Sequence, residues 1–421
     1  MNVFSVVKKN FQNLNIVCLL ASSIVPFLVT GPFIPDLILS SLSIWFLYYC
    51  IKKKIFKIFK NKYFLVFIIF WIICVLSSLL SDEILFSLKS SIFYIRIGIF
   101  ALLISYLIDV NKKILDFFYY AIAITFLILV IDGFFQHFTG YNILGYSKYT
   151  IRVSSFFGDE YILGSYLTRL SPLFFALFIV REKKNFESYF FFILLFLVSI
   201  LIFLSGERAA FFLSILSSVF IIFFISSYKY QRLLIFLISL IVIISILVKD
   251  SKFSDRFYHS IVKDMRIENN NFSKILIFTQ MHNSLYRTGF KMFLDQPILG
   301  HGPKLFRKKC NNIKYSTGVY PCSNHPHNFY IQLLAETGLI GFSFLFGLFI
   351  YFIYIVTNHI FRIYKYKEKL FSDYQLCLLA GLLITIWPIT SNGNFFSNYL
   401  VLTYSLQMGF FKKNLGISVN N

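Results

Sequence analysis

The chain has 421 residues, of which 57% are hydrophobic and 14% charged, with a formal net charge of +21. Its mean hydropathy of +0.72 excludes a water-soluble globular protein of this length and indicates a polytopic membrane protein. The basic residues are spread beside successive apolar segments, which argues against a nucleic-acid partner. We therefore expect a single all-α membrane domain over residues 1–421.

Twelve apolar runs reach the roughly 17–25 residues that a helix needs to cross a hydrocarbon core of about 30 Å. We predict transmembrane helices over residues 14–30, 33–50, 62–81, 90–108, 114–132, 161–180, 188–205, 208–227, 231–248, 337–357, 373–391 and 394–411. The first run follows two lysines, as in a signal peptide, but it has no clear small-x-small cleavage site and leads straight into another run. An uncleaved first helix is the better interpretation.

Orientation follows from the short loops, because Lys and Arg are retained on the cytoplasmic side. With the N-terminus in the cytoplasm, the short segments on the exported side hold only Lys89, Lys148, Arg152 and Arg208. Both termini are therefore predicted to be cytoplasmic. Two exported segments are long enough to carry chemistry, a shorter loop over residues 133–160 and a large loop over residues 249–328.

The large loop contains more Lys and Arg than Asp and Glu. Loops longer than about 60 residues escape the orientation rule, so this excess has another origin, either anionic lipid headgroups or an anionic substrate. Cys310 and Cys322 both lie in the loop, and an oxidising compartment would permit a disulfide between them. The alternative is a pair of unpaired thiols.

Arg208 begins the predicted helix at 208–227, on the exported side. A cation there opposes the helix dipole, and Glu207 does not simply neutralise it because adjacent residues point in different directions. The arrangement becomes favourable if an anion binds the free backbone N–H groups and the guanidinium together. The alternative is an arginine that snorkels to the interface.

Two further arginines lie in the exported loops. Arg287 precedes Phe290, Phe293 and Leu294, which predict a short amphipathic helix on the bilayer that ends near Pro297. Its guanidinium would face an anion at the headgroup level or be solvated. Arg152, in the shorter loop, is a weaker candidate. The polar residues inside predicted helices, Arg96, Asp132 and Arg169, are interpreted as helix-pairing residues.

His327 has the richest context. Asn328 is a good N-cap for a helix that begins at Phe329, and a histidine at a helix N-terminus favours the neutral imidazole. A neutral imidazole can accept a proton from an alcohol, as a general base does. The alternatives are a structural histidine or a metal pair with His325, but no companion cysteine or carboxylate stands at ligand spacing, so no metal is expected.

The sequence His327-Asn328, followed after nine residues by Gly338-x-x-Gly341, resembles the signature of the O-antigen ligase and polymerase superfamily. The turn at Arg208 and the segment from Arg287 to a Pro-x-x-Gly-x-Gly sequence are also similar to the family's pattern. Members of this superfamily are inner-membrane glycosyltransferases that use polyprenyl-diphosphate-linked sugars.

The resemblance implies roles for these residues. Arginines matching Arg208 and Arg287 bind the donor diphosphate, with Arg152 as an additional candidate, and the histidine matching His327 is catalytic. Asn328, Gly338 and Gly341 are the structural part of the motif, and the candidates for an acceptor contact or an alternative base are His325, Asp159 and Glu160. An acceptor hydroxyl would attack the anomeric carbon with inversion at the periplasmic face, undecaprenyl diphosphate would leave, and no cofactor is required.

Among the subfamilies, we expect a ligase that transfers O-polysaccharide to lipid A-core. About 400 residues, twelve predicted helices and one dominant exported loop are typical of ligases. Polymerases often carry two sizeable exported loops and an Arg-x10-Gly pattern, which fails at Arg152, Arg208 and Arg287. A protein O-oligosaccharyltransferase is a further alternative. A transporter or flippase would favour broken helices near the midplane in two related halves, whereas the suggestive residues here lie at one face.

Overall fold

The computed structural model describes residues 3–181, 185–264 and 278–411. In this part of the chain the architecture is helical, as expected, and the only β-structure is two isolated bridges within the segment 141–152. The principal helices are α1 (Val3–Phe27), α2 (Phe33–Lys53), α3 (Lys62–Leu79), α4 (Ile84–Ser91), α5 (Ile95–Val110), α6 (Lys113–Thr139), α7 (Leu163–Val180), α8 (Asn185–Leu204), α9 (Arg208–Phe224), α10 (Lys229–Lys249), α13 (Gln280–Asp295), α15 (Phe329–Tyr366), α16 (Asp373–Ile386) and α17 (Asn398–Phe410).

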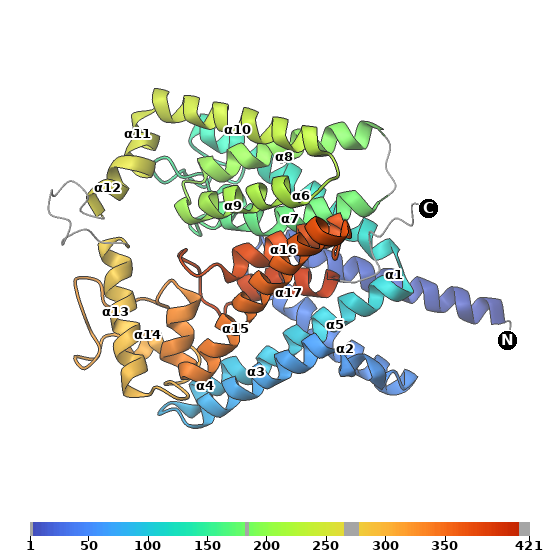
Figure 1. Ribbon diagram of the computed structural model, residues 1–421, viewed down its shortest axis with the longest axis horizontal. Coiled ribbons are helices and arrows are strands. Elements are labelled where there is room, and N and C mark those ends of the chain that lie inside the picture. Colours follow the sequence, from blue (N-terminus) through green and yellow to red (C-terminus); the bar gives the residue numbers. More distant parts are fainter. Residues whose placement is uncertain (1–2, 182–184, 265–277, 412–421) are drawn as a thin grey trace.

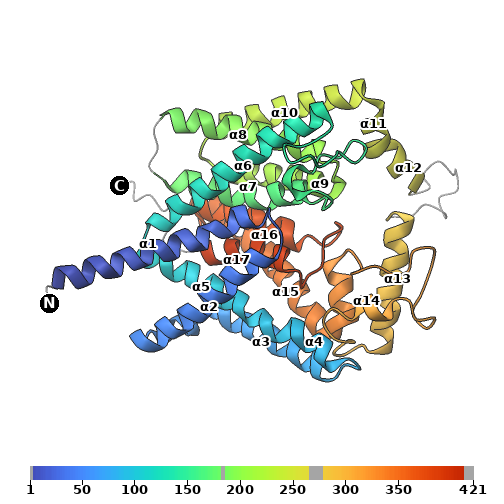
Figure 2. The same cartoon turned by 180° about the vertical axis from the view of Figure 1, so that it is seen from behind.

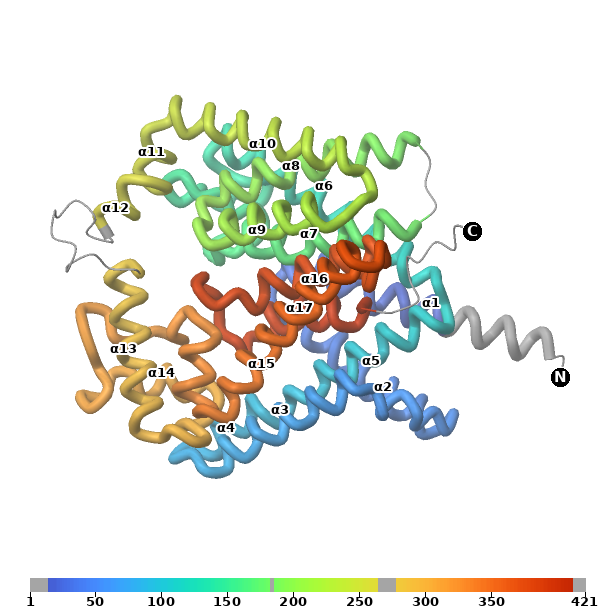
Figure 3. The backbone as a smooth tube through the Cα atoms, viewed as in Figure 1, coloured from blue at the N-terminus to red at the C-terminus, as the bar shows by residue number. Residues whose placement is uncertain are grey.

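The helices form layers (Figure 1). The group α6–α10 lies on one side, α2–α5 lies on the other, and α15–α17 run between them, as the view from behind also shows (Figure 2). Short helices of the large loop, α11 (Ser251–Ser254), α12 (Ser260–Asp264), α13 and α14 (Phe306–Lys309), gather at one end of the bundle (Figure 3). The loop that the sequence assigns to the exported side therefore covers one end of the helices.

Eight helical segments of the described chain are long and apolar enough to cross a membrane. They are α2, α3, residues Ile84–Val110, α6, α7, α8, α10 and α15, and three shorter apolar helices cover Leu14–Phe27, α9 and α16. The chain is thus a polytopic membrane protein. The figure of twelve transmembrane helices stays a prediction, because α9, α16 and α17 have at most 17 residues each.

Helix α10 illustrates a surface suited to lipid. Leu234, Ile241 and Val248 are exposed on it, whereas Ser239 and Arg232 are buried. A soluble helix would place its polar residues outside and its apolar residues inside. The reversed pattern fits a hydrocarbon environment, in which polar groups are satisfied within the bundle.

One predicted boundary was wrong near the C-terminal end. Helix α15, Phe329–Tyr366, has non-helical backbone angles at Gly338, so it consists of a short helix and a longer one that meet at a kink, as predicted. The expected helices 373–391 and 394–411 are separated by a longer non-helical segment, residues 387–397. Pro388 explains the early end of α16, because a residue before proline is disfavoured in helical conformation.

The polar residues predicted to pair helices have different partners. Arg96 on α5 forms an ion pair with Asp36 on α2 at 2.5 Å, as expected for a helix-pairing residue. Asp132 instead holds the shorter exported loop, because it accepts hydrogen bonds from Ser155 Oγ at 2.5 Å and from the Ile143 backbone N–H at 2.9 Å. Its role is therefore to anchor that loop to α6.

Candidate functional site

A cavity of about 1140 Å³ lies at the end of the bundle covered by the large loop. Its wall comes from the turn between α1 and α2, the loop before α7, the starts of α7 and α9, the loop before α15 and the segment before α17. Six of the residues singled out from the sequence line it: Arg152, Asp159, Glu160, Arg208, His325 and His327. Residues from distant parts of the chain thus share one chamber.

Arginines surround the turn that precedes α9. Arg208 is the first residue of α9. Arg152 donates from Nε to the Ser205 carbonyl at 3.4 Å, and its guanidinium lies 4.5 Å from the centre of the Tyr161 ring. Arg256 donates from Nε to the Gly206 carbonyl at 2.6 Å. Burial, together with Arg152 and Arg208, lowers the pKa of Arg256 to about 10, so this guanidinium remains charged at neutral pH. The three arginines form a site suited to an anion.

Glu207 lies within this arginine cluster but is directed to α7. Its Oε1 accepts from the Gly164 backbone N–H at 2.6 Å and its Oε2 accepts from that of Ser165 at 3.3 Å, so the carboxylate caps the N-terminus of α7. Burial raises the pKa of Glu207 to about 7. The carboxylate therefore ties α9 to α7 across the cavity wall.

His327 is held by its backbone in a conformation that few residues adopt. Its φ of 58° lies in the left-handed region, and its carbonyl accepts a hydrogen bond from the Asn392 N–H at 2.8 Å. Its Nε2 is 3.4 Å from Ser323 Oγ, and its ring centre is 4.1 Å from that of His325. Burial lowers the pKa of His327, and burial and His327 lower the pKa of His325 to about 3. Both imidazoles are therefore neutral at pH 7.

Asn328 caps α15, as predicted. Its Oδ1 accepts from the backbone N–H groups of Tyr330 and Ile331, at 2.9 and 3.2 Å, and its Nδ2 donates to the Pro388 carbonyl at 2.7 Å. The same side chain thus starts α15 and holds the non-helical segment 387–397. This explains how Asn328 contributes to the position of the preceding histidine.

Gly338 lies at the kink of α15 with φ 64° and ψ −163°, a region open essentially to glycine alone. The Leu339 N–H donates to the Pro297 carbonyl at 2.8 Å, and the Gly302 N–H donates to the Glu336 carbonyl at 2.8 Å. The Pro-x-x-Gly-x-Gly segment 297–302 therefore packs backbone to backbone on the kink. Two parts of the sequence pattern that are separated along the chain meet here.

Gly341 provides space for a neighbouring side chain in the same turn. A Cβ at this position would overlap Thr337 Oγ1, which donates to the Leu333 carbonyl at 2.8 Å. The absence of a side chain at Gly341 leaves room for this threonine. The glycine therefore contributes to the packing of the kink.

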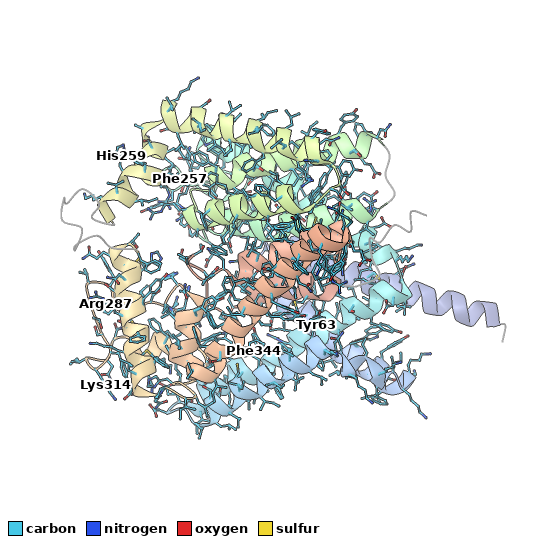
Figure 4. The ribbon with its side chains drawn as sticks, viewed as in Figure 1. Tyr63, Phe257, His259, Arg287, Lys314 and Phe344 are labelled. Atoms are coloured by element: carbon cyan, nitrogen blue, oxygen red, sulfur yellow. A yellow bond between two sulfur atoms is a disulfide. The ribbon has the colours of Figure 1, made fainter. Side chains whose placement is uncertain are left out.

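Arg287 does not line the cavity. It lies on α13, on which Thr288, Gly289 and Met292 are buried. Gly289 lies against Ile331 of α15. Arg287 is exposed and lies on the outward side of α13 (Figure 4). Arg208 and His327 therefore share one cavity, whereas Arg287 does not join them, because its neighbours on α13 occupy the face that packs on α15.

A disulfide links Cys310 to Cys322, with the Cα atoms 4.9 Å apart, as predicted. It closes the part of the loop that leads to His325. Within the described residues, no group of three or more His, Cys, Asp or Glu side chains is arranged to hold a metal ion.

Several residues in or beside the cavity were missed from the sequence. Arg256 contacts the turn before α9 without lining the cavity, and it carried no local signal because it is one of many basic residues in the large loop. Lys304 lines the cavity from the loop before α14 and Arg307 from α14 itself, and Asn392 and Asn394 line it from the segment before α17. The polar run Ser391–Asn394 after Pro388 was the available signal, since it interrupts an otherwise apolar stretch.

Comparison with known proteins identifies the segment that carries most of this site. A family model described as O-antigen ligase matches residues 193–346. The match includes Arg208, Arg256, Arg287, His327 and both motif glycines, whereas Arg152 and the segment 387–397 lie outside it. A search of curated protein sequences finds no match. Residues 193–346 of this polytopic chain, which hold Arg208 and His327, thus match the O-antigen ligase domain.

Proposed function

We propose that the protein is an O-antigen ligase. It transfers undecaprenyl-diphosphate-linked O-polysaccharide to a sugar hydroxyl of lipid A-core at the periplasmic face of the inner membrane, with both termini in the cytoplasm. The observation that carries this proposal is the single cavity of about 1140 Å³ lined by both Arg208 and His327. Its volume exceeds the range of about 300–1000 Å³ that is typical of small-molecule sites, and leaves room for a diphosphate and a sugar together.

The arginine cluster suits the leaving group. We assign Arg208, with Arg152 and Arg256, to the donor diphosphate, because planar guanidinium groups bind phosphate oxygens with two hydrogen bonds. The C–O bond to the anomeric carbon breaks and its electrons stay on the diphosphate. Charge stabilisation by the arginines replaces protonation of this leaving group.

His327 suits the acceptor. Its neutral ring takes the proton of the acceptor hydroxyl, or orients that hydroxyl, while the hydroxyl oxygen forms the new bond to the anomeric carbon. Attack from the face opposite the diphosphate inverts the anomeric carbon. Asp159, Glu160 and His325 line the same cavity and are the alternative bases or acceptor contacts. No cofactor or metal takes part in this scheme.

The experiment is the lipopolysaccharide profile of a deletion strain complemented with the wild type, His327→Ala or His259→Ala. His259 is an exposed histidine of the same loop, outside the cavity (Figure 4), and serves as the matched control. A ligase that depends on His327 predicts loss of long-chain lipopolysaccharide and accumulation of polymerised lipid-linked chains in His327→Ala alone. A core carrying one repeat identifies a polymerase.

The reaction products distinguish two other functions from a ligase. A protein O-oligosaccharyltransferase leaves the lipopolysaccharide unchanged and adds glycan to a protein. A transporter or flippase makes no glycosidic bond in detergent from purified lipid-linked sugar and acceptor. Formation of that bond by the purified protein would exclude transport alone.

A further inference from the structure

Arg169 on α7 is a buried cation in the wall of the cavity. It exposes 3% of its surface and lines the chamber. Its Nε donates to Ser165 Oγ at 3.3 Å, and its Nη2 donates to Asn392 Oδ1 at 2.9 Å. Its Nη1 is buried and has no hydrogen-bond partner among the described residues. The hydrogen-bond partners of this guanidinium are both neutral, and the acidic side chain that interacts with its charge, Glu207, is directed to the N-terminus of α7.

Arg232 shows what a structural arginine looks like in the same bundle. It exposes 7% of its surface and lies on α10, away from the large cavity. Its Nε donates to the Ser227 carbonyl at 2.9 Å, its Nη2 donates to the Ile225 carbonyl at 2.6 Å, and its Nη1 bonds to the carbonyl of Ile221. All three nitrogens are satisfied by backbone oxygens near the C-terminal end of α9, where the helix dipole favours a cation. Arg169 lacks this complete set.

Asn394 supplies a second unused donor in the same cavity. It exposes 8% of its surface, and its Oδ1 accepts from Gln332 Nε2 at 3.0 Å and from the Phe396 N–H at 2.8 Å. Its Nδ2 has no partner in the part of the chain that the structure describes. Two buried donors of one chamber are therefore left for a bound molecule, and an unpaired buried donor is costly.

Arg169 connects the start of α7 to the segment before α17. Its Nε bonds to Ser165, whose backbone N–H bonds to Glu207 beside the arginine cluster, and its Nη2 bonds to Asn392. The Nη2 side of the guanidinium therefore faces the segment that carries Asn392 and Asn394. A diphosphate held at Arg208 leaves this side of Arg169 for another part of the substrate.

We propose that Arg169, together with Asn394 Nδ2, forms a second anion site that binds a carboxylate or phosphate on the sugar next to the bond being made. This inference rests on the proposed function, because it names the sugar chemistry of that cavity. A buried charge is tolerated when a partner compensates it, and a guanidinium matches the two oxygens of such an anion. The site therefore selects acidic over neutral sugars.

The test measures binding of three synthetic polyprenyl-diphosphate donors to the full-length protein in detergent by thermophoresis. The donors carry glucose, glucuronic acid or glucose 6-phosphate, and inorganic pyrophosphate probes the diphosphate site alone. We expect the wild type to bind one acidic donor at least about tenfold more tightly than the glucose donor. The two acidic donors distinguish a carboxylate from a phosphate.

Arg169→Gln is expected to bring that ratio to about one and to leave pyrophosphate binding within about twofold. Asn394→Asp keeps the accepting oxygen and replaces Nδ2 by an oxygen that repels an anion, so it is a second variant with the same expected loss. Arg232→Gln is the buried control that keeps the ratio. Arg208→Gln is expected to weaken the binding of all three donors by a similar factor.

A wild-type ratio near one, or an unchanged ratio in both Arg169→Gln and Asn394→Asp, overturns the acidic site. Loss of pyrophosphate binding in Arg169→Gln also overturns it, because Arg169 would then belong to the diphosphate site. Wild-type protein that binds neither pyrophosphate nor any donor contradicts the proposed function itself. The two failures are therefore distinguishable.

Discussion

Replacement of Gly338 by alanine tests the packing of the motif. The residue has φ 64° and ψ −163°, and an added Cβ would overlap the carbonyl of Ile298 and lie 2.6 Å from the Leu299 nitrogen. Both atoms belong to backbone, which cannot rotate away. The conformation costs about 1–3 kcal/mol for a residue with a side chain, and overpacking costs about 1–3 kcal/mol. We expect Gly338→Ala to lower the free energy of unfolding by about 2–6 kcal/mol.

Gly347 on the same helix is the matched control. Its added Cβ would have no atom within 4 Å, and alanine is favoured over glycine in a helix by up to about 1 kcal/mol. The measurements are thermal unfolding in detergent, followed by size-exclusion chromatography, and the lipopolysaccharide profile. A Gly338→Ala protein that unfolds within about 0.5 kcal/mol of Gly347→Ala would refute the account of the kink.

The remaining predictions concern the cavity. His327→Gln is expected to lower the transfer rate by at least about 100-fold. Because burial lowers the pKa of His327 and the neutral ring is the proposed base, wild-type activity should fall on acidification below this pKa, and activity that does not fall on acidification would contradict the base. Arg256→Gln should raise the KM for donor about tenfold or more, and Arg287→Gln should raise it less. A larger increase in Arg287→Gln, measured by donor titration, would instead favour Arg287 as the diphosphate-binding residue. Asn328→Ala removes a helix cap and should lower the free energy of unfolding by about 1–2 kcal/mol, measured by thermal unfolding against wild type.

The helices themselves were largely predictable, because apolar runs of the required length are direct consequences of the hydrocarbon thickness. The break over residues 387–397 was not, since its own apolar residues, Trp387, Ile389, Phe395 and Phe396, keep the hydropathy high. The N-cap at Asn328 and the Cys310–Cys322 disulfide were predictable from short-range patterns.

The site was predictable only where a local rule applied. Arg208 stands out because a cation at a helix N-terminus is unfavourable by itself, and His327 stands out beside an N-cap. The face of α13 occupied by Arg287 depends on which side packs on α15, and hydropathy did not decide this, since Phe290 and Leu294 are exposed. Arg256 reaches the turn at Gly206 only through the tertiary fold.

The two parts of the motif have a mechanical connection that spacing alone does not reveal. Gly300 lies against the kink, where an added Cβ would be 2.5 Å from the Glu336 carbonyl carbon. Lys304 and Arg307 follow Gly302 closely along the chain. His327 and Asn328 directly precede α15, at the start of the short helix that ends at the kink. Glycines at both surfaces let the backbones touch, so the contact fixes how far the basic side chains stand from the imidazole. Under the proposed function, backbone contact at the two glycine sites sets the catalytic geometry of this cavity, and larger side chains there would separate the groups that are proposed to act together.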